Sequence, residues 1–263
     1  MANSTFSIHG PSERHFSRVG AAAAILGIVV YTVSAVLHPW TPPHETEAAF
    51  SDYAVEQNWA LIHLGELLGI LLFSAAVIAL AWRLRRGTSG VWATLGAAAM
   101  VVSAGVYAVF AAVDGVALGI MANRWVGAEA EQQGVVFEAA FAVRQIEAGL
   151  FSLQWLMFGI AAALFAVAFF AGARSALRPG WLSGMGWLSI VASIGTIAFG
   201  LVQAQNGFSP ISMAFQTGLY PPVLWLIGVA WFLYRHPEFI HHPDEGRWSD
   251  PGQAAREQAQ MNA

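Results

Sequence analysis

Six long apolar stretches dominate this sequence, and they restrict the folds that the chain can adopt. A helix needs about 20 apolar residues to cross the hydrocarbon core of a bilayer, and it satisfies its own backbone hydrogen bonds there. We therefore predict an all-α fold, a polytopic transmembrane helical bundle with six spans. The predicted spans are Val19–Leu37, Ala60–Trp82, Val91–Met121, Ile146–Ala171, Trp181–Val202 and Gly218–Tyr234. The sixth is short, because Pro221 and Pro222 interrupt its start.

The composition agrees with a chain whose surface faces lipid. Of its 263 residues, 57% are hydrophobic and 11% are charged, whereas a soluble domain carries about 25% charged residues. We expect residues 1–18 to form a cytoplasmic N-terminal segment and residues 19–235 to form the transmembrane domain. Residues 236–263 are polar, which is typical of a disordered cytoplasmic tail.

Two missing residue types exclude several kinds of chemistry. The chain has no cysteine, so disulfides, thiolate metal ligands and cysteine nucleophiles are excluded. It also has no lysine, because all 12 basic residues are arginines, and this excludes lysine Schiff bases. The net charge of -4 is small and indicates no nucleic-acid partner.

The arginines indicate which way the spans run, because cytoplasmic loops of membrane proteins are enriched in basic residues. Arginines precede the first predicted span and follow the second, fourth and sixth: Arg14, Arg18, Arg83, Arg85, Arg86, Arg174, Arg178 and Arg235. The loop between the first two spans instead contains Glu45, Glu47, Asp52 and Glu56. We predict that both termini are cytoplasmic and that the protein lies in the plasma membrane, the inner membrane of a bacterial cell.

The ionisable residues of the spans all fall in the outer half of the predicted bundle. Ionisable residues inside spans are costly and usually face the bundle interior or a cavity. His63 and Glu66 are three residues apart, so they share one helix face. The candidate ligand-binding residues are His38, Trp59, His63, Glu66, Tyr107, Asp114, Arg144, Glu147 and Gln154.

Each candidate also has a purely structural interpretation. His38 can be an interfacial residue at the end of a span, and Arg144 with Glu147 can form a simple salt bridge along one helix. Glu66 and Asp114 are harder to explain in this way, because their neighbours are apolar. Even so, both can serve as hydrogen-bonding groups that stabilise the bundle.

Three functional hypotheses follow from this cluster. The first is that an outer pocket binds a membrane lipid or a small amphiphile. The second is a metal-dependent membrane hydrolase in which His63, Glu66, Asp114 and Glu147 bind Zn or Mn. The third is a purely structural membrane protein. Axial haem ligation by His38 and His63 ranks below a pocket without metal, and the pattern predicts no oligomeric state.

Several phrases of the sequence resemble those of uncharacterised multi-pass membrane proteins that are common in actinobacteria. They are Leu37-His38-Pro39, the run from Trp59 to Gly69, the run from Asp114 to Leu118, and Arg144-x2-Glu147-x-Gly149. The resemblance covers about residues 15–235 and implies the same multi-pass architecture. That family has no established activity, so the resemblance implies no reaction.

The orientation can be tested with topology reporters. A reporter fused after Arg86 should read as cytoplasmic, and one placed in the loop between Glu45 and Glu56 should read as external, because basic loops remain inside. The opposite pattern of reporter activity would invert the predicted orientation and place the polar cluster on the cytoplasmic side.

Overall fold

The structure, a computed structural model, describes residues 11–175 and 180–235, and all regular elements within these ranges are helical. The elements are α1 (Pro11–Leu37), α2 (Thr46–Val55), α3 (Trp59–Arg83), α4 (Gly87–Ala112), the π-helix η1 (Val113–Leu118), α5 (Gly119–Val126), α6 (Ala130–Ser175), α7 (Gly180–Asn206), α8 (Pro210–Phe215), the 3-10 helix η2 (Gln216–Leu219) and α9 (Tyr220–Arg235). The predicted tail, residues 236–263, lies outside the described residues.

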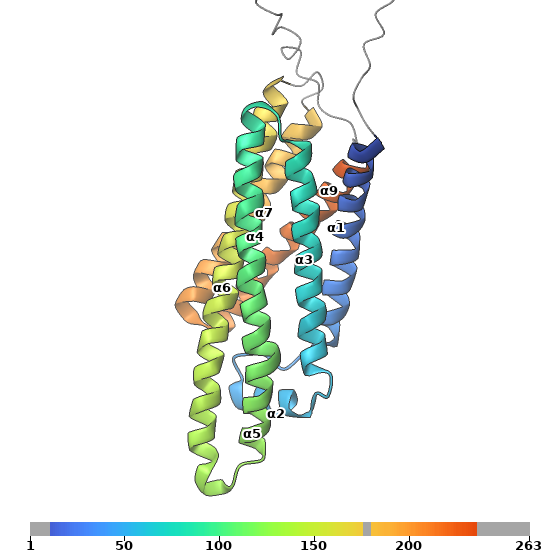
Figure 1. Cartoon of the computed structure of the whole chain (residues 1–263). Helices are drawn as coiled ribbons and strands as arrows, with labels where there is room; N and C mark the ends of the chain where they lie inside the picture. Colours follow the sequence, from blue (N-terminus) through green and yellow to red (C-terminus); the bar gives the residue numbers. More distant parts are fainter. Residues whose placement is uncertain (1–10, 176–179, 236–263) are drawn as a thin grey trace, which may run out of the picture.

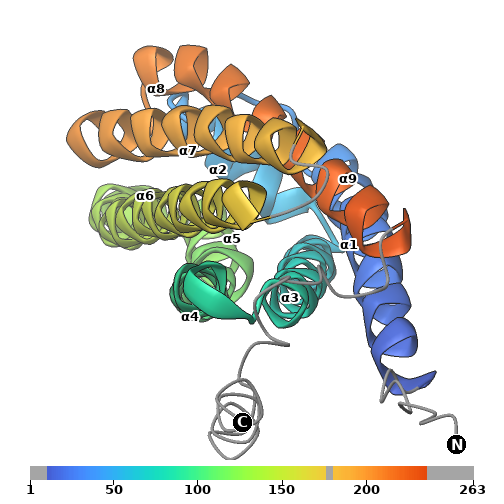
Figure 2. The ribbon, with the colours of Figure 1, turned by 90° about the horizontal axis from the view of Figure 1, so that it is seen from above.

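Six helical segments are long and apolar enough to cross a membrane, which confirms the predicted number of spans. They follow one another around the bundle in chain order, and α9 closes the ring by packing against both α7 and α1 (Figure 2). The apolar core lies within this ring. Its largest side chains include the aromatic residues Trp225, Phe158 and Phe165, and Trp225 contacts both phenylalanines.

The prolines at the start of the sixth predicted span do not break its helix. Pro221 and Pro222 occupy the first turn of α9, which begins at Tyr220. A proline is tolerated at this position because the first backbone N–H groups of a helix have no partner inside it. The short helices α8 and η2 precede α9, and together they form a segment of 26 helical residues, Pro210–Arg235.

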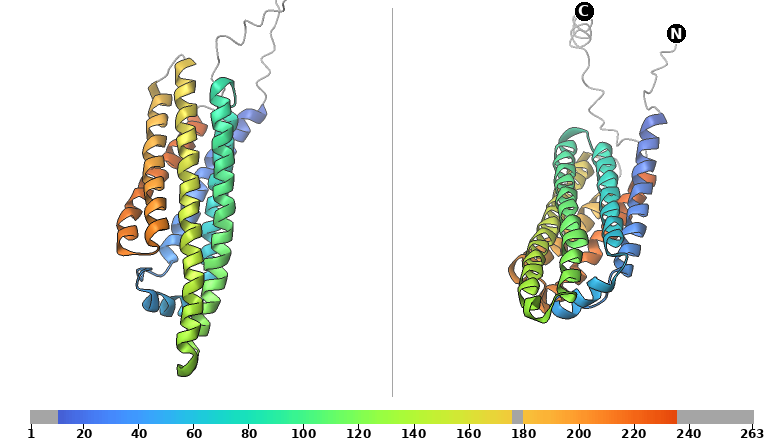
Figure 3. Two further views of the ribbon diagram at one scale, coloured as in Figure 1. Left: turned by 90° about the vertical axis from the view of Figure 1, so that its left-hand side faces the viewer. Right: turned by 60° about the horizontal axis from the view of Figure 1, so that its bottom comes forward.

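Two of the helical segments are longer than a bilayer requires. The segment Gly87–Val126 has 40 residues, which corresponds to about 60 Å of helix, against a hydrocarbon core of about 30 Å. Its partner α6 begins at Ala130, well before the predicted start of the fourth span at Ile146. The hairpin between α5 and α6 therefore extends past the other helices (Figures 1 and 3).

The helix α2 packs against this extension and was not expected from the sequence, where its residues read as an acidic loop. Phe50 and Tyr53 of α2 are buried with Leu118, Ala122 and Trp59 in a second apolar cluster. This cluster lies at one end of the bundle (Figure 1), and it holds the connection between α1 and α3 against the extended hairpin.

The helix α3 approaches η1 and the start of α5 closely, because Gly115 and Gly119 face two bulky side chains of α3. A Cβ atom at Gly115 would lie 2.5 Å from the Cβ of His63, and one at Gly119 would lie 2.6 Å from Cδ1 of Trp59. Both distances are shorter than van der Waals contact, so only glycine fits at either position without a shift of the helices. This contact sets the separation of the two elements that carry His63 and Asp114.

Gly115→Ala should destabilise the protein, by about 1–3 kcal/mol, because the added methyl group overpacks the α3–η1 contact. The measurement is thermal or denaturant unfolding of the purified protein in detergent. Gly105→Ala is the matched control, because no atom lies within 4 Å of a Cβ at Gly105. Equal unfolding of the two variants would show that the close approach is not required.

Candidate functional site

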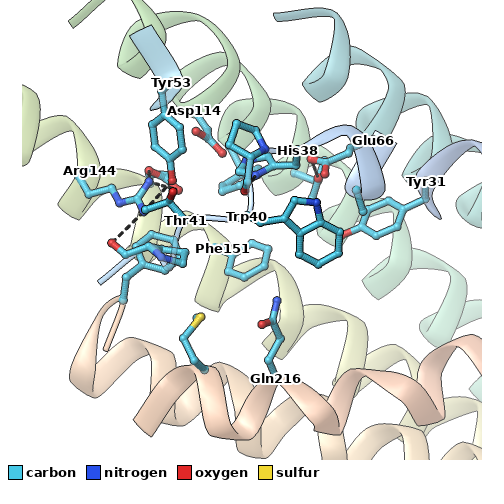
Figure 4. A pocket seen from close by; sticks show the side chains of 18 residues that line it. Tyr31, His38, Trp40, Thr41, Tyr53, Glu66, Asp114, Arg144, Phe151 and Gln216 are labelled. Carbon is cyan, nitrogen blue, oxygen red and sulfur yellow. Dashed lines mark hydrogen bonds and ion pairs between the residues drawn. The ribbon is translucent and has the colours of Figure 1, made fainter. Parts of the chain in front are cut away.

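A cavity of about 280 Å³ lies at the end of the bundle where α1 ends and α3 begins. Glu66, on its wall, precedes Arg83 by 17 residues, which is about 25 Å along α3, against a hydrocarbon core of about 30 Å. The lining residues are Tyr31, Ala35, His38, Pro39, Trp40, Thr41, Pro43, Tyr53, Glu66, Tyr107, Phe110, Asp114, Arg144, Glu147, Phe151, Phe208, Met213 and Gln216. Gln216 of η2 faces the ionisable side chains from the opposite side (Figure 4).

A buried pair of His63 and Asp114 joins α3 to η1 behind the cavity wall. His63 Nε2 lies 2.8 Å from Asp114 Oδ2, and His63 Nδ1 lies 2.8 Å from the backbone carbonyl oxygen of Trp59. A carbonyl oxygen can only accept, so Nδ1 carries a proton and donates it. The side chains of His63 and Asp114 are almost completely buried. The second carboxylate oxygen, Asp114 Oδ1, has no hydrogen-bond partner in the part of the chain that the structure describes.

Trp59 braces both members of this pair. Its carbonyl oxygen accepts from His63, and its indole Nε1–H donates to the backbone carbonyl of Asp114 over 2.8 Å. Asp114 lies in the π-helical turn η1, and such turns inside an α-helix occur frequently at functional sites. The arrangement therefore holds the imidazole and the carboxylate in one fixed relation.

His38, which follows the end of α1, lies beside His63 and Trp59. Its ring centroid lies 5.4 Å from that of His63 and 5.0 Å from that of Trp59. Its Nδ1 lies 3.0 Å from the carbonyl oxygen of Pro39, so this nitrogen also donates to a carbonyl. Burial lowers the pKa of His38 below its ordinary value of 6.5, which keeps the imidazole neutral at neutral pH.

Glu66 and Tyr107 form a second polar contact on the cavity wall. The Tyr107 hydroxyl donates to Glu66 Oε2 over 2.8 Å, and both residues are buried. This bond connects α3 to α4. Glu66 forms no ion pair with an arginine or histidine among the described residues, in contrast to Asp114 and Glu147.

Arg144 and Glu147 of α6 form the third polar element. Arg144 Nη1 lies 3.1 Å from Glu147 Oε2, and Nη2 donates to the carbonyl of Pro43 over 3.2 Å and to the Tyr53 hydroxyl over 3.3 Å. The guanidinium also lies 4.2 Å from the ring centroid of Phe208. Burial raises the pKa of Tyr53 to about 12, so its hydroxyl stays protonated at neutral pH. Arg144 thus ties α6 to the loop before α2 and to α2 itself.

The structure places most of the predicted site residues together. The cavity is lined by His38, Glu66, Tyr107, Asp114, Arg144 and Glu147. Trp59 and His63 are not among the lining residues and support Asp114 from behind. Gln154 lies elsewhere, in the contact between α6 and α4, where its amide group donates to the Ser103 hydroxyl over 3.4 Å.

Sequence reasoning missed several of the aromatic side chains of the cavity. Tyr31 and Tyr53 line it, as do Trp40 and Phe208. Trp40 could have been suspected because it follows the Leu37-His38-Pro39 phrase. The others carry no local signal, because a tyrosine or phenylalanine in an apolar helix or short loop has the same pattern whether it faces a cavity or the core.

The residues that could hold a metal ion in the structure differ from the set predicted from the sequence. The predicted set was His63, Glu66, Asp114 and Glu147. Among the described residues, the group whose ligand atoms come together is His38, His63 and Asp114, with all three atoms within 4.8 Å of one another. Glu66 and Glu147 fall outside this group, because they bond to Tyr107 and Arg144 instead.

Comparisons with protein-family models, with curated proteins and with solved structures found no match to this chain. The geometry of the cavity and its ionisable side chains is therefore the basis for the functional proposals.

Glu147→Gln should destabilise the fold, by about 3 kcal/mol, because it leaves the buried guanidinium of Arg144 without its carboxylate. The measurement is the unfolding of the purified protein followed by circular dichroism. The double variant R144M/E147M should recover most of the loss, because it removes both buried charges and retains apolar volume. If the single variant unfolds like the wild type, the pair is not a structural element of the fold.

Proposed function

We propose that this protein binds the polar headgroup of a membrane lipid, or of another small amphiphile, in the cavity at the end of the bundle. The observation that carries the proposal is the lining of this cavity. The wall combines ionisable side chains, Asp114 and Arg144 among them, with aromatic side chains such as Trp40 and Phe208. Binding sites for small molecules typically combine an apolar lining with a few placed polar groups.

The size and depth of the cavity favour a headgroup over an entire lipid. Its volume of about 280 Å³ is close to the lower end of small-molecule sites, which begin at about 300 Å³. The polar wall lies near the edge of the hydrocarbon core, where headgroups are found. An amphiphile can therefore place its polar part in the cavity and leave its acyl chains in the bilayer.

The proposal includes an orientation, with both termini in the cytoplasm and the cavity on the outer side of the plasma membrane. The distribution of arginines supports it, because Arg83, Arg85 and Arg86 lie at the opposite end of α3 and α4 from the cavity. In this orientation the cavity faces the outer leaflet.

A metal-dependent membrane hydrolase is the second candidate, and one observation favours it. The ligand atoms of His38, His63 and Asp114 come together, and two of these residues line the cavity. A metal ion held by these residues would supply a Lewis acid and an activated water beside the ester of a bound amphiphile. Hydrolysis of a lipid ester by the purified protein, abolished by chelator and restored by Zn²⁺, would favour the hydrolase over simple binding.

The binding proposal can be tested with soluble amphiphiles. We expect dihexanoyl phosphatidylethanolamine or dihexanoyl phosphatidylglycerol to raise the melting temperature of the detergent-purified protein, because a ligand of the folded state stabilises it. Trp40→Ala should weaken this binding about tenfold, since the loss of an aromatic wall costs about 1.4 kcal/mol. A chelator is present throughout, so that the result does not depend on metal.

Trp187→Ala is the matched control for that experiment. Trp40 and Trp187 are both strongly exposed, at 81% and 63%, but Trp187 lies on α7 and does not line the cavity. Binding that is absent for both amphiphiles, or equally affected by the two substitutions, would overturn the proposal. A purely structural role would be favoured if Asp114→Asn and Glu66→Gln lowered the melting temperature and no amphiphile bound the wild type.

A further inference from the structure

Two histidines on different segments use the same ring nitrogen, Nδ1, to bond a backbone carbonyl. The Nδ1–H of His63 donates to the carbonyl of Trp59 over 2.8 Å, and the Nδ1–H of His38 donates to the carbonyl of Pro39 over 3.0 Å. In a neutral imidazole the other nitrogen, Nε2, then carries a lone pair. Histidines that bind metal ions almost always donate their second nitrogen to a carbonyl, a carboxylate or water in this way.

The imidazole of His63 lies directly against the Asp114 carboxylate. Its Nε2 lies 2.8 Å from Asp114 Oδ2, so a positive centre lies between the two atoms, either a proton on Nε2 or a metal ion that takes its place. Asp114 Oδ1 has no partner among the described residues, although the side chain is more than nine-tenths buried. A buried polar atom without a partner is costly, so a further ligand at Oδ1 would stabilise this carboxylate.

The ionisable groups around the cavity also favour a bound cation. Glu66, Asp114 and Glu147 line it with Arg144, so the carboxyl groups of the cavity outnumber its guanidinium three to one. Buried charges are normally paired or bound to a metal ion. A divalent cation balances this excess.

The three ligand atoms already lie within 4.8 Å of one another. Ligands on one tetrahedral ion with bonds of about 2.0–2.1 Å are about 3.3 Å apart, so a shift of about 1–1.5 Å completes the site. His38 is able to make this shift, because it lies beyond the last residue of α1 and is less buried than the other two.

We propose that His38, His63 and Asp114 bind one divalent transition-metal ion, with its remaining coordination positions directed into the cavity. Two imidazoles and one carboxylate suit Zn²⁺, Fe²⁺ or Mn²⁺. Trp59 is a positioning residue for this ion, because it holds the His63 ring through its carbonyl and Asp114 through its indole. The proposal does not depend on amphiphile binding.

The experiment measures Zn²⁺ binding to the full chain, purified in detergent without a histidine tag and treated with chelator. We expect one equivalent per chain by titration calorimetry and elemental analysis. His38→Ala, His63→Ala and Asp114→Asn should each weaken binding at least about 100-fold. Trp59→Phe, which removes the indole donor, should weaken it about 10- to 100-fold, as is typical for residues that position metal ligands.

Three controls keep the result specific. His44→Ala changes a histidine of the same loop that is not in the group and should leave binding unchanged. The double variant H241A/H242A tests the tail, which lies outside the described residues, and should also bind normally. Glu66→Gln should retain the ion, because Glu66 bonds to Tyr107 and not to the group.

Folding is monitored separately by thermal melting without metal. His38 lies outside the spanning helices, so His38→Ala is expected to keep its melting profile and lose only the ion. With Co²⁺ in place of Zn²⁺, the wild type should show visible absorption bands that are absent in His38→Ala.

The proposal is overturned if the wild type binds no Zn²⁺ at micromolar concentration, or if His38→Ala and Asp114→Asn bind it as the wild type does. Either result would mean that the His63–Asp114 contact is held by a shared proton alone.

Discussion

The contact between α3 and the π-helical turn η1 is the interaction on which the site depends. Gly115 of η1 and Gly119, the first residue of α5, allow α3 to approach until His63 and Trp59 lie directly against them. At that distance the indole of Trp59 reaches the backbone of Asp114, and the imidazole of His63 reaches its carboxylate. Because both hydrogen bonds are buried, they hold the register of one helix against the other.

The extension of the α5–α6 hairpin beyond the other helices completes the cavity. A bundle that ended at the membrane surface would leave Asp114 and Arg144 open to water. Here α5 and the first part of α6 continue past the spans, and α2 folds onto them through Phe50 and Tyr53. Arg144 then binds the loop before α2 and the Tyr53 hydroxyl. The cavity is therefore built partly from spanning helices and partly from segments outside them.

The proposed amphiphile and metal sites share one wall and use different atoms of it. Asp114 contributes to the metal group, while Arg144 and the aromatic side chains of Trp40 and Phe208 surround the remaining space. A metal ion held by His38, His63 and Asp114 would change the charge that an entering headgroup meets. The two proposals are therefore linked in chemistry, although each stands on separate observations.

Much of the fold could be predicted, because a bilayer imposes a simple requirement on sequence. Each spanning helix must be apolar for about 20 residues, and this property is local, so the six spans are visible without any knowledge of their neighbours. The depth of each polar residue is local as well, since it depends on distance along one helix. For this reason His38, Glu66, Asp114 and Arg144 were correctly expected to lie near one end.

The pairing of those residues could not be predicted, because it depends on the rotation and register of one helix against another. The sequence shows that Glu66 and His63 share a face, but not that Tyr107 meets Glu66 while Asp114 meets His63. Nor does it show that His38, and not Glu66 or Glu147, lies beside the pair of His63 and Asp114. The sequence by itself determined six apolar helices and a polar end. The tertiary structure decided which polar groups meet, because side-chain packing, such as Gly115 against His63, sets how closely and in what register the helices pack.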